Sequence, residues 1–66
     1  MIAEILATGD EIRTGALVDS NSAYIARRLE EAGVEVVRHS SVGDDPEALV
    51  SILQEIACRA DIAVVT

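Results

Sequence analysis

The 66-residue chain is almost without aromatic residues, since Tyr24 is the only one and both tryptophan and phenylalanine are absent. Its core must therefore consist of alanine, valine, isoleucine and leucine, which suit the layered packing of helices on a sheet. Cys58 is the only cysteine. A single thiol cannot close an internal disulfide, so a cysteine-rich secreted scaffold is excluded and a reducing cytoplasm is the expected location.

Lysine is also absent, and five arginines stand against twelve acidic residues, which gives a formal net charge of −7. This charge argues against a nucleic-acid backbone or an anionic membrane surface as the main partner. No run of about 18 apolar residues is present, so no membrane-spanning segment is expected. The residues after Met1 also lack the basic and apolar regions of a signal peptide. We therefore expect a cytoplasmic protein whose partners are neither nucleic acid nor membrane.

The residues that are present alternate between apolar runs and helical stripes. Residues 2–7, 34–38 and 62–65 are predicted strands, and residues 8–20 and 39–45 are predicted loops. Two helical faces are predicted from apolar spacing, the first from Ile25, Leu29 and Ala32 and the second from Leu49, Ile52, Leu53 and Ile56. Gly33 is suited to end the first helix, and Pro46 to begin the second with Asp45 or Asp44 as its cap.

This alternation predicts an α/β fold of three layers, with parallel strands joined by right-handed crossovers in the order 2-1-3. We interpret residues 1–66 as the N-terminal portion of a single domain that is incomplete at its C-terminal end. In open sheets of this kind ligands bind at the carboxyl ends of strands beside a change in strand order. The residues after the first strand are therefore the first place to look for a site.

Three polar segments fall at such positions, and each has a structural and a functional interpretation. Gly9, Asp10 and Glu11 form either a solvated turn or a site where the two carboxylates hold a divalent cation that binds phosphate. Asp19, Ser20 and Asn21 either cap the first helix or present its N-terminus to an anionic group. Asp44 either belongs to a turn or lies near a ligand or a metal. Lone His39 is not expected to bind zinc, and Cys58 is expected to be a packed thiol.

The order of these features is more specific than any one of them. The first strand runs into Thr-Gly-Asp-Glu-Ile, followed by Asp-Ser-Asn at 19–21, Val-Gly-Asp-Asp at 42–45 and Ala-Asp-Ile at 60–62. This order resembles the MoaB/Mog-like molybdopterin-binding family along essentially the whole chain, and within it the N-terminal domain of CinA-like, competence/damage-inducible proteins. MoeA proteins share part of the order, but in them other domains precede this segment.

The resemblance implies a domain that binds a nucleotide- or pterin-like ligand, with a divalent cation such as Mg²⁺. In the parent protein it implies metal-dependent cleavage of the ADP-ribose pyrophosphate and assembly as a homo-oligomer. The ligand-binding candidates are Gly9, Asp10, Glu11, Asp19, Ser20, Asn21 and Asp44, with Asp10 and Glu11 near the metal, and no catalytic residue is assigned. The family's Gly-rich run would follow Thr66, and the nicotinamide mononucleotide deamidase belongs to a separate domain, so these 66 residues are expected to be inactive alone. The alternative is a non-catalytic molybdopterin-binding or oligomerisation module.

Overall fold

Three parallel strands form the middle layer of the molecule, and the computed structural model describes all 66 residues. The strand order is β2-β1-β3, so the first strand is central, as the sequence predicts. Along the chain the elements are β1 (Ile2–Thr8), α1 (Asp10–Arg13), α2 (Ser20–Glu31), β2 (Glu35–Val42), α3 (Pro46–Arg59) and β3 (Ile62–Val65).

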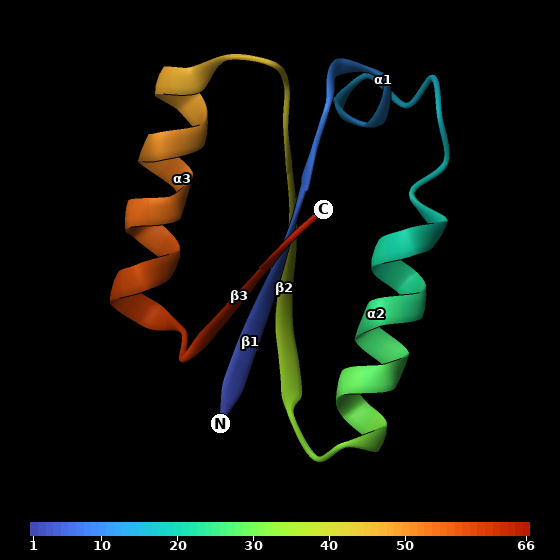
Figure 1. Cartoon of the computed structure of the whole chain (residues 1–66), viewed down its shortest axis with the longest axis vertical. Helices are drawn as coiled ribbons and strands as arrows, with labels where there is room; N and C mark the ends of the chain where they lie inside the picture. The colour runs from blue at the N-terminus through green and yellow to red at the C-terminus, as the bar shows by residue number, and fades with distance from the viewer.

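The two long helices cover opposite faces of the sheet, so the predicted three-layer α/β architecture is confirmed. Figure 1 shows the strands edge-on, with α3 against one face and α2 against the other. All residues from Ala3 to Ala7 are buried, as expected for a central strand covered on both faces. None of the helices has the length and hydropathy needed to cross a membrane.

The α3 face contains the main core cluster, in which Leu6 from β1, Val42 from β2 and Ile56 from α3 are buried together. Leu49, Ile52 and Leu53 pack against this cluster, so the stripe predicted for the second helix is confirmed. On α2, Ile25 and Leu29 are half-buried as predicted, but Ala32 is exposed because the helix ends there.

Local sequence signals set the helix ends. Asp19 caps α2, and Gly33 follows its last turn with φ +86°, a conformation that glycine adopts at low cost. Asp45 caps α3 and Pro46 occupies its first turn, so Asp45 rather than Asp44 is the cap. These capping groups satisfy N–H groups that the helix itself leaves without partners.

Two predicted loops are partly regular structure. Residues 10–13 form the short helix α1, although they lie within the predicted loop 8–20. The second strand extends to Val42 rather than ending at residue 38, so residues 39–42 are also not a loop. They continue the strand because each pairs with a residue of β1, up to Thr8 opposite Val42.

A register shift in the β1–β2 ladder changes which side chains are neighbours. Ala3 pairs with Val36, whereas Glu4 pairs with Arg38, so Val37 is the extra residue of a bulge. The bulge brings Arg38 beside Glu4, where its Nε lies 3.8 Å from the Glu4 carboxylate.

Candidate functional site

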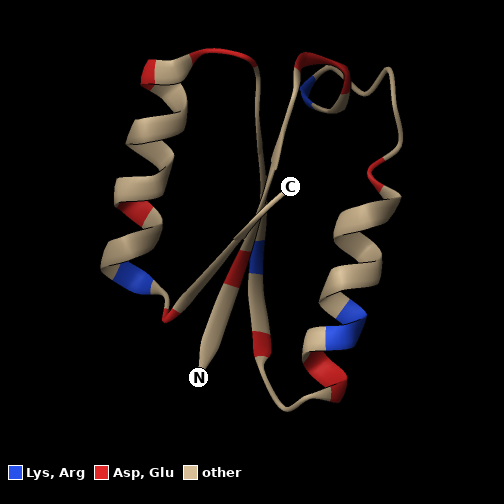
Figure 2. Ribbon diagram, in the orientation of Figure 1, with Lys and Arg blue, Asp and Glu red and all other residues tan.

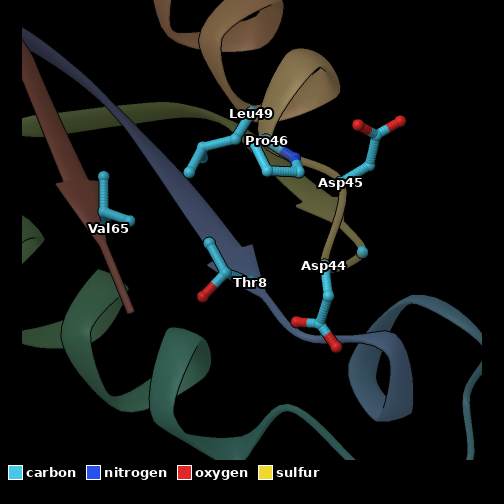
Figure 3. Close-up of a pocket in the computed structure, with 7 residues that line it drawn as sticks. Thr8, Asp44, Asp45, Pro46, Leu49 and Val65 are labelled. Atoms are coloured by element: carbon cyan, nitrogen blue, oxygen red, sulfur yellow. The ribbon is translucent and has the colours of Figure 1, made fainter.

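The structure has a single cavity, and it lies at the carboxyl ends of β1 and β3 (Figure 3). Its volume is about 360 Å³, which is within the range of small-ligand sites. It opens on the α3 side of the sheet, because the first turn of α3 forms one wall. The lining residues are Thr8, Gly43, Asp44, Asp45, Pro46, Leu49 and Val65.

Thr8 forms the floor where β1 ends. Its backbone N–H donates to the Thr66 carbonyl oxygen at 3.0 Å, and its hydroxyl donates to the same oxygen at 2.7 Å. The two bonds fix the end of β3 beside β1, and the hydroxyl oxygen keeps its acceptor capacity. Thr8 was not among the predicted ligand-binding residues, although its position as the last residue of the central strand is the available signal.

Asp44 and Asp45 are adjacent in sequence but do different things. Asp45 accepts a hydrogen bond from the Glu47 N–H at 3.0 Å and so caps α3. Its side chain points away from Thr8 and Val65, whereas the Asp44 carboxylate lies on the side of the β1–α1 connection (Figure 3). Asp44, a predicted site residue, therefore lines the cavity with a carboxylate that has no hydrogen bond or ion pair to the protein.

Gly9, Asp10 and Glu11 lie beside the cavity and are not part of its lining. Gly9 has φ +123°, and its N–H donates to the Val42 carbonyl at 2.9 Å, which turns the chain across the end of β2. Asp10 Oδ1 accepts from the Asp44 N–H and from Arg13 Nε, each at 3.3 Å. Of the two carboxylates predicted to face a metal, Asp10 is thus already engaged and Glu11 is free of protein partners.

Asp19, Ser20 and Asn21 lie on the other side of the sheet from the cavity, because they begin α2 (Figure 1). Asp19 accepts from the Ser22 N–H at 3.1 Å, which is the capping role considered for this segment. The structure does not bring these residues together with Thr8 and Asp44. Ser22 has a buried hydroxyl without a hydrogen-bond partner, a feature for which the sequence gives no signal.

Metal-ligating side chains do not gather anywhere into a group of three. His39 is exposed on β2, and Cys58 is exposed on α3 rather than packed as predicted. Cys58 is solvated because it falls outside the stripe that meets the core. A cation at the cavity would therefore share its coordination between one or two carboxylates and oxygens of a ligand or water.

Acidic residues nevertheless dominate this end of the molecule (Figure 2). Six of the twelve acidic residues lie there, against Arg13 as the only cation. They are Asp10 and Glu11 on α1, Asp19 at the start of α2, and Asp44, Asp45 and Glu47 at the start of α3. A bare anionic ligand would be repelled, whereas a ligand carrying a cation would be attracted.

Far from the cavity, β1 carries a buried carboxylate, Glu4, to which the sequence pattern assigns no role. Glu4 is buried on the α3 face, and Arg59 binds it through two hydrogen bonds, Nε at 2.6 Å and Nη2 at 2.9 Å. Arg59 holds the pKa of Glu4 below its ordinary value, and Arg38 adds to this effect, while burial acts in the opposite direction. The group joins the end of α3 to the sheet and has no contact with the cavity lining.

The fold and the cavity together define the class: an α/β domain of parallel strands with a small-ligand cavity at the carboxyl ends of the strands. A family model described as "Probable molybdopterin binding domain" matches residues 4–66. The chain therefore belongs to this family of molybdopterin-binding-type domains.

Individual relatives agree with this assignment. The chain is 53% identical over its full length to a CinA-like protein of Desulfosudis oleivorans and 46% identical to one of Citrifermentans bemidjiense. It spans 16% of the length of each. Among solved structures it is similar to a protein CinA, described as of unknown function, from Thermoplasma acidophilum. The TM-score is 0.93 at 28% identity, covering 98% of this chain and 40% of that one.

Proposed function

We propose that the chain binds a small nucleotide- or pterin-like ligand in the cavity at the carboxyl ends of β1 and β3. The observation that carries this proposal is the cavity itself, formed by Thr8, Asp44, Val65 and the first turn of α3 at the point where the strand order changes. Pro46, Leu49 and Val65 offer an apolar wall for a flat ring, and Thr8 and Asp44 offer polar contacts. The family assignment supports the same class of ligand.

We include a divalent cation such as Mg²⁺ in this proposal. The carboxylates of Asp44 and Glu11 are free of protein partners, whereas Asp10 already accepts two hydrogen bonds through Oδ1. This donor set fits a cation held jointly by carboxylates and ligand phosphates, and it does not fit a cage made of protein alone. The cation would neutralise the phosphates, which the acidic end of the molecule otherwise repels.

For the whole protein we extend the proposal to metal-dependent hydrolysis of the ADP-ribose pyrophosphate in the cytoplasm. The cavity residues of this chain would supply ligand binding and orientation. Asp19, Ser20 and Asn21 would contribute only to a ligand that reaches around the edge of the sheet, because they begin the helix on its other face.

Calorimetric titration of ADP-ribose and of a soluble pterin, with and without Mg²⁺, tests the proposal. We expect Mg²⁺ to tighten the binding of ADP-ribose by about tenfold or more, because it removes a charge repulsion. The Asp44→Asn variant should lose most of this gain. The Glu31→Gln variant, which removes an exposed carboxylate at the far end of α2, should keep it. If neither compound binds, with or without Mg²⁺, the proposal is contradicted.

The second candidate function is a non-catalytic module that associates with copies of itself. The observation that favours it is the exposed apolar pair before α2, Leu17 and Val18, with 60% and 85% of their surface exposed. Light scattering after size-exclusion chromatography should then give a mass above that of a monomer, and the Leu17→Ser/Val18→Ser variant should lower it. A monomer at all concentrations would remove this candidate.

A further inference from the structure

The connection between β1 and α1 is fastened to the connection between β2 and α3. Gly9 N–H donates to the Val42 carbonyl at 2.9 Å, and Asp10 Oδ1 accepts from the Asp44 N–H at 3.3 Å. The second connection includes Gly43, Asp44 and Asp45, three of the seven residues that line the cavity. The first connection therefore determines where part of the cavity wall lies.

The steric environment of Gly43 indicates that this contact is closely packed. A Cβ atom at Gly43 would overlap the Asp10 carboxylate oxygen, and it would lie 2.8 Å from Arg13 Nε. Asp10 and Arg13 thus lie directly against the backbone at Gly43. The φ angle of Gly43 is not positive, so a side chain there would be opposed by the close approach of Asp10 and Arg13 and not by the backbone conformation.

Arg13 orients the carboxylate that makes this contact. Its Nε donates to the same Oδ1 at 3.3 Å from one turn further along α1. The pair is half-exposed, with 53% and 55% of the two side chains accessible, so the ion pair adds little to overall stability. Its effect is local, because the carboxylate is held against the amide of one particular residue.

We propose that Asp10 is a positioning residue, which with Arg13 holds Asp44 at the cavity by accepting a hydrogen bond from the Asp44 backbone. The importance of this for ligand binding rests on the function proposed above, whereas the positioning itself does not. In this role Asp10 acts through Asp44, so its carboxylate need not touch a ligand or a cation.

The exchange rate of the Asp44 backbone amide with solvent, measured by NMR on the 66-residue chain, tests the positioning directly. Asp10→Ala should speed this exchange about fivefold, the size expected for one lost hydrogen bond, and leave the amides of Ile5 and Leu6 unchanged. Asp10→Asn keeps an acceptor oxygen and should restore most of the protection. Glu11→Gln, a neighbouring carboxylate without contact to Asp44, is the matched control and should change nothing at Asp44.

Titration of ADP-ribose into Asp10→Ala and Asp10→Asn distinguishes a positioning role of Asp10 from a direct contact between Asp10 and the ligand. Asp10→Ala should weaken binding, and Asp10→Asn should bind nearly as well as the native chain. An Asp44 amide that exchanges at the native rate in Asp10→Ala overturns the positioning role, whatever the binding data are. Loss of binding in Asp10→Asn with a protected Asp44 amide leaves the positioning contact intact and contradicts the inference that Asp10 acts only through Asp44, because it marks Asp10 as a direct contact. A native chain that binds no ADP-ribose contradicts the proposed function, while the exchange rates still decide the role of Asp10.

Discussion

At the scale of single residues, Gly43 is the position where the smallest change should have a specific effect. A methyl group there must displace the Asp10 and Arg13 side chains, which are flexible and exposed. We expect Gly43→Ala to change the free energy of unfolding by less than about 1 kcal/mol, because these side chains can swing into solvent. The Asp44 amide should exchange as fast as in Asp10→Ala. A native exchange rate in Gly43→Ala would show that the hydrogen bond between the Asp44 amide and Asp10 does not depend on the close approach at Gly43.

Gly9 differs from Gly43 in the reason for its glycine. Its φ of +123° lies in a region that residues with a side chain rarely adopt. We expect Gly9→Ala to lower the free energy of unfolding by about 1–2 kcal/mol, the usual size of such backbone strain. Urea denaturation measures the loss, and Gly9→Ala with native stability would mean that the turn can adopt another conformation.

Glu4 gives a pH dependence whose sign follows from its lowered pKa. The ion pair with Arg59 is present in full above the ordinary value of 4.5 and is lost as the pH falls through the lowered pKa of the folded state. At neutral pH we expect Glu4→Gln to lower the free energy of unfolding by about 1–2 kcal/mol, because two charge-assisted hydrogen bonds are weakened.

The difference in the free energy of unfolding between the native chain and Glu4→Gln should become smaller as the pH falls below 4.5. It narrows because protonation removes the same charge that the substitution removes. Urea denaturation over a series of pH values measures both curves. A difference that stays constant into acid would show that the stability of Glu4 does not come from its charge.

At the scale of elements, the sequence predicts those whose signal is periodic. The stripe from Leu49 to Ile56 predicts α3, and the unbroken run at 62–65 predicts β3 with the observed bounds. α1 is missed because four residues are too few to show a period. The end of β2 is missed because Ser40 and Ser41 have low strand preference, and only pairing with β1 keeps them extended.

α3 has one fully buried residue, Ile56, and its burial gives a prediction for the helix as a whole. Ile56 is 1% exposed in contact with Leu6 and Val42. Ile56→Ala should lower the free energy of unfolding by about 3 kcal/mol, whereas the total for a chain of this length is roughly 3–10 kcal/mol. Much of the helical circular dichroism should therefore be lost at mild urea concentrations. Val50→Ala, 53% exposed on the same helix, is the control, and equal losses for the two variants would contradict the packing.

At the scale of the whole molecule, topology was predictable and site geometry only in part. Alternating strands and helices predict parallel strands, and the expected order 2-1-3 is the observed one, which places the cavity at the carboxyl ends of the strands. The sequence cannot tell which face of the sheet the cavity opens on. Asp19 was therefore predicted to belong to the same site as Asp10 and Asp44, whereas in the structure the sheet lies between Asp19 and the cavity.

The separation of charge across the molecule gives the last prediction. The net charge is −7, and half of the acidic residues lie at the cavity end of a molecule that measures 31 × 26 × 12 Å. At low salt the screening length is comparable to these dimensions, so the carboxylates repel one another across that end. Raising NaCl from about 0.02 to 0.3 M should therefore raise the melting temperature by a few degrees.

MgCl₂ at the same ionic strength distinguishes screening from binding. A cation that binds the folded chain stabilises it beyond the screening effect, by an amount that grows with its concentration. We expect a higher melting temperature in MgCl₂ than in NaCl for the native chain and for Glu31→Gln. Asp44→Asn should give the same temperature in both salts, since it removes the free carboxylate of the cavity while most of the acidic end remains. Identical melting of the native chain in the two salts would show that the carboxylates there repel one another without holding a cation, and a bound phosphate ligand would then have to be neutralised by groups outside these residues.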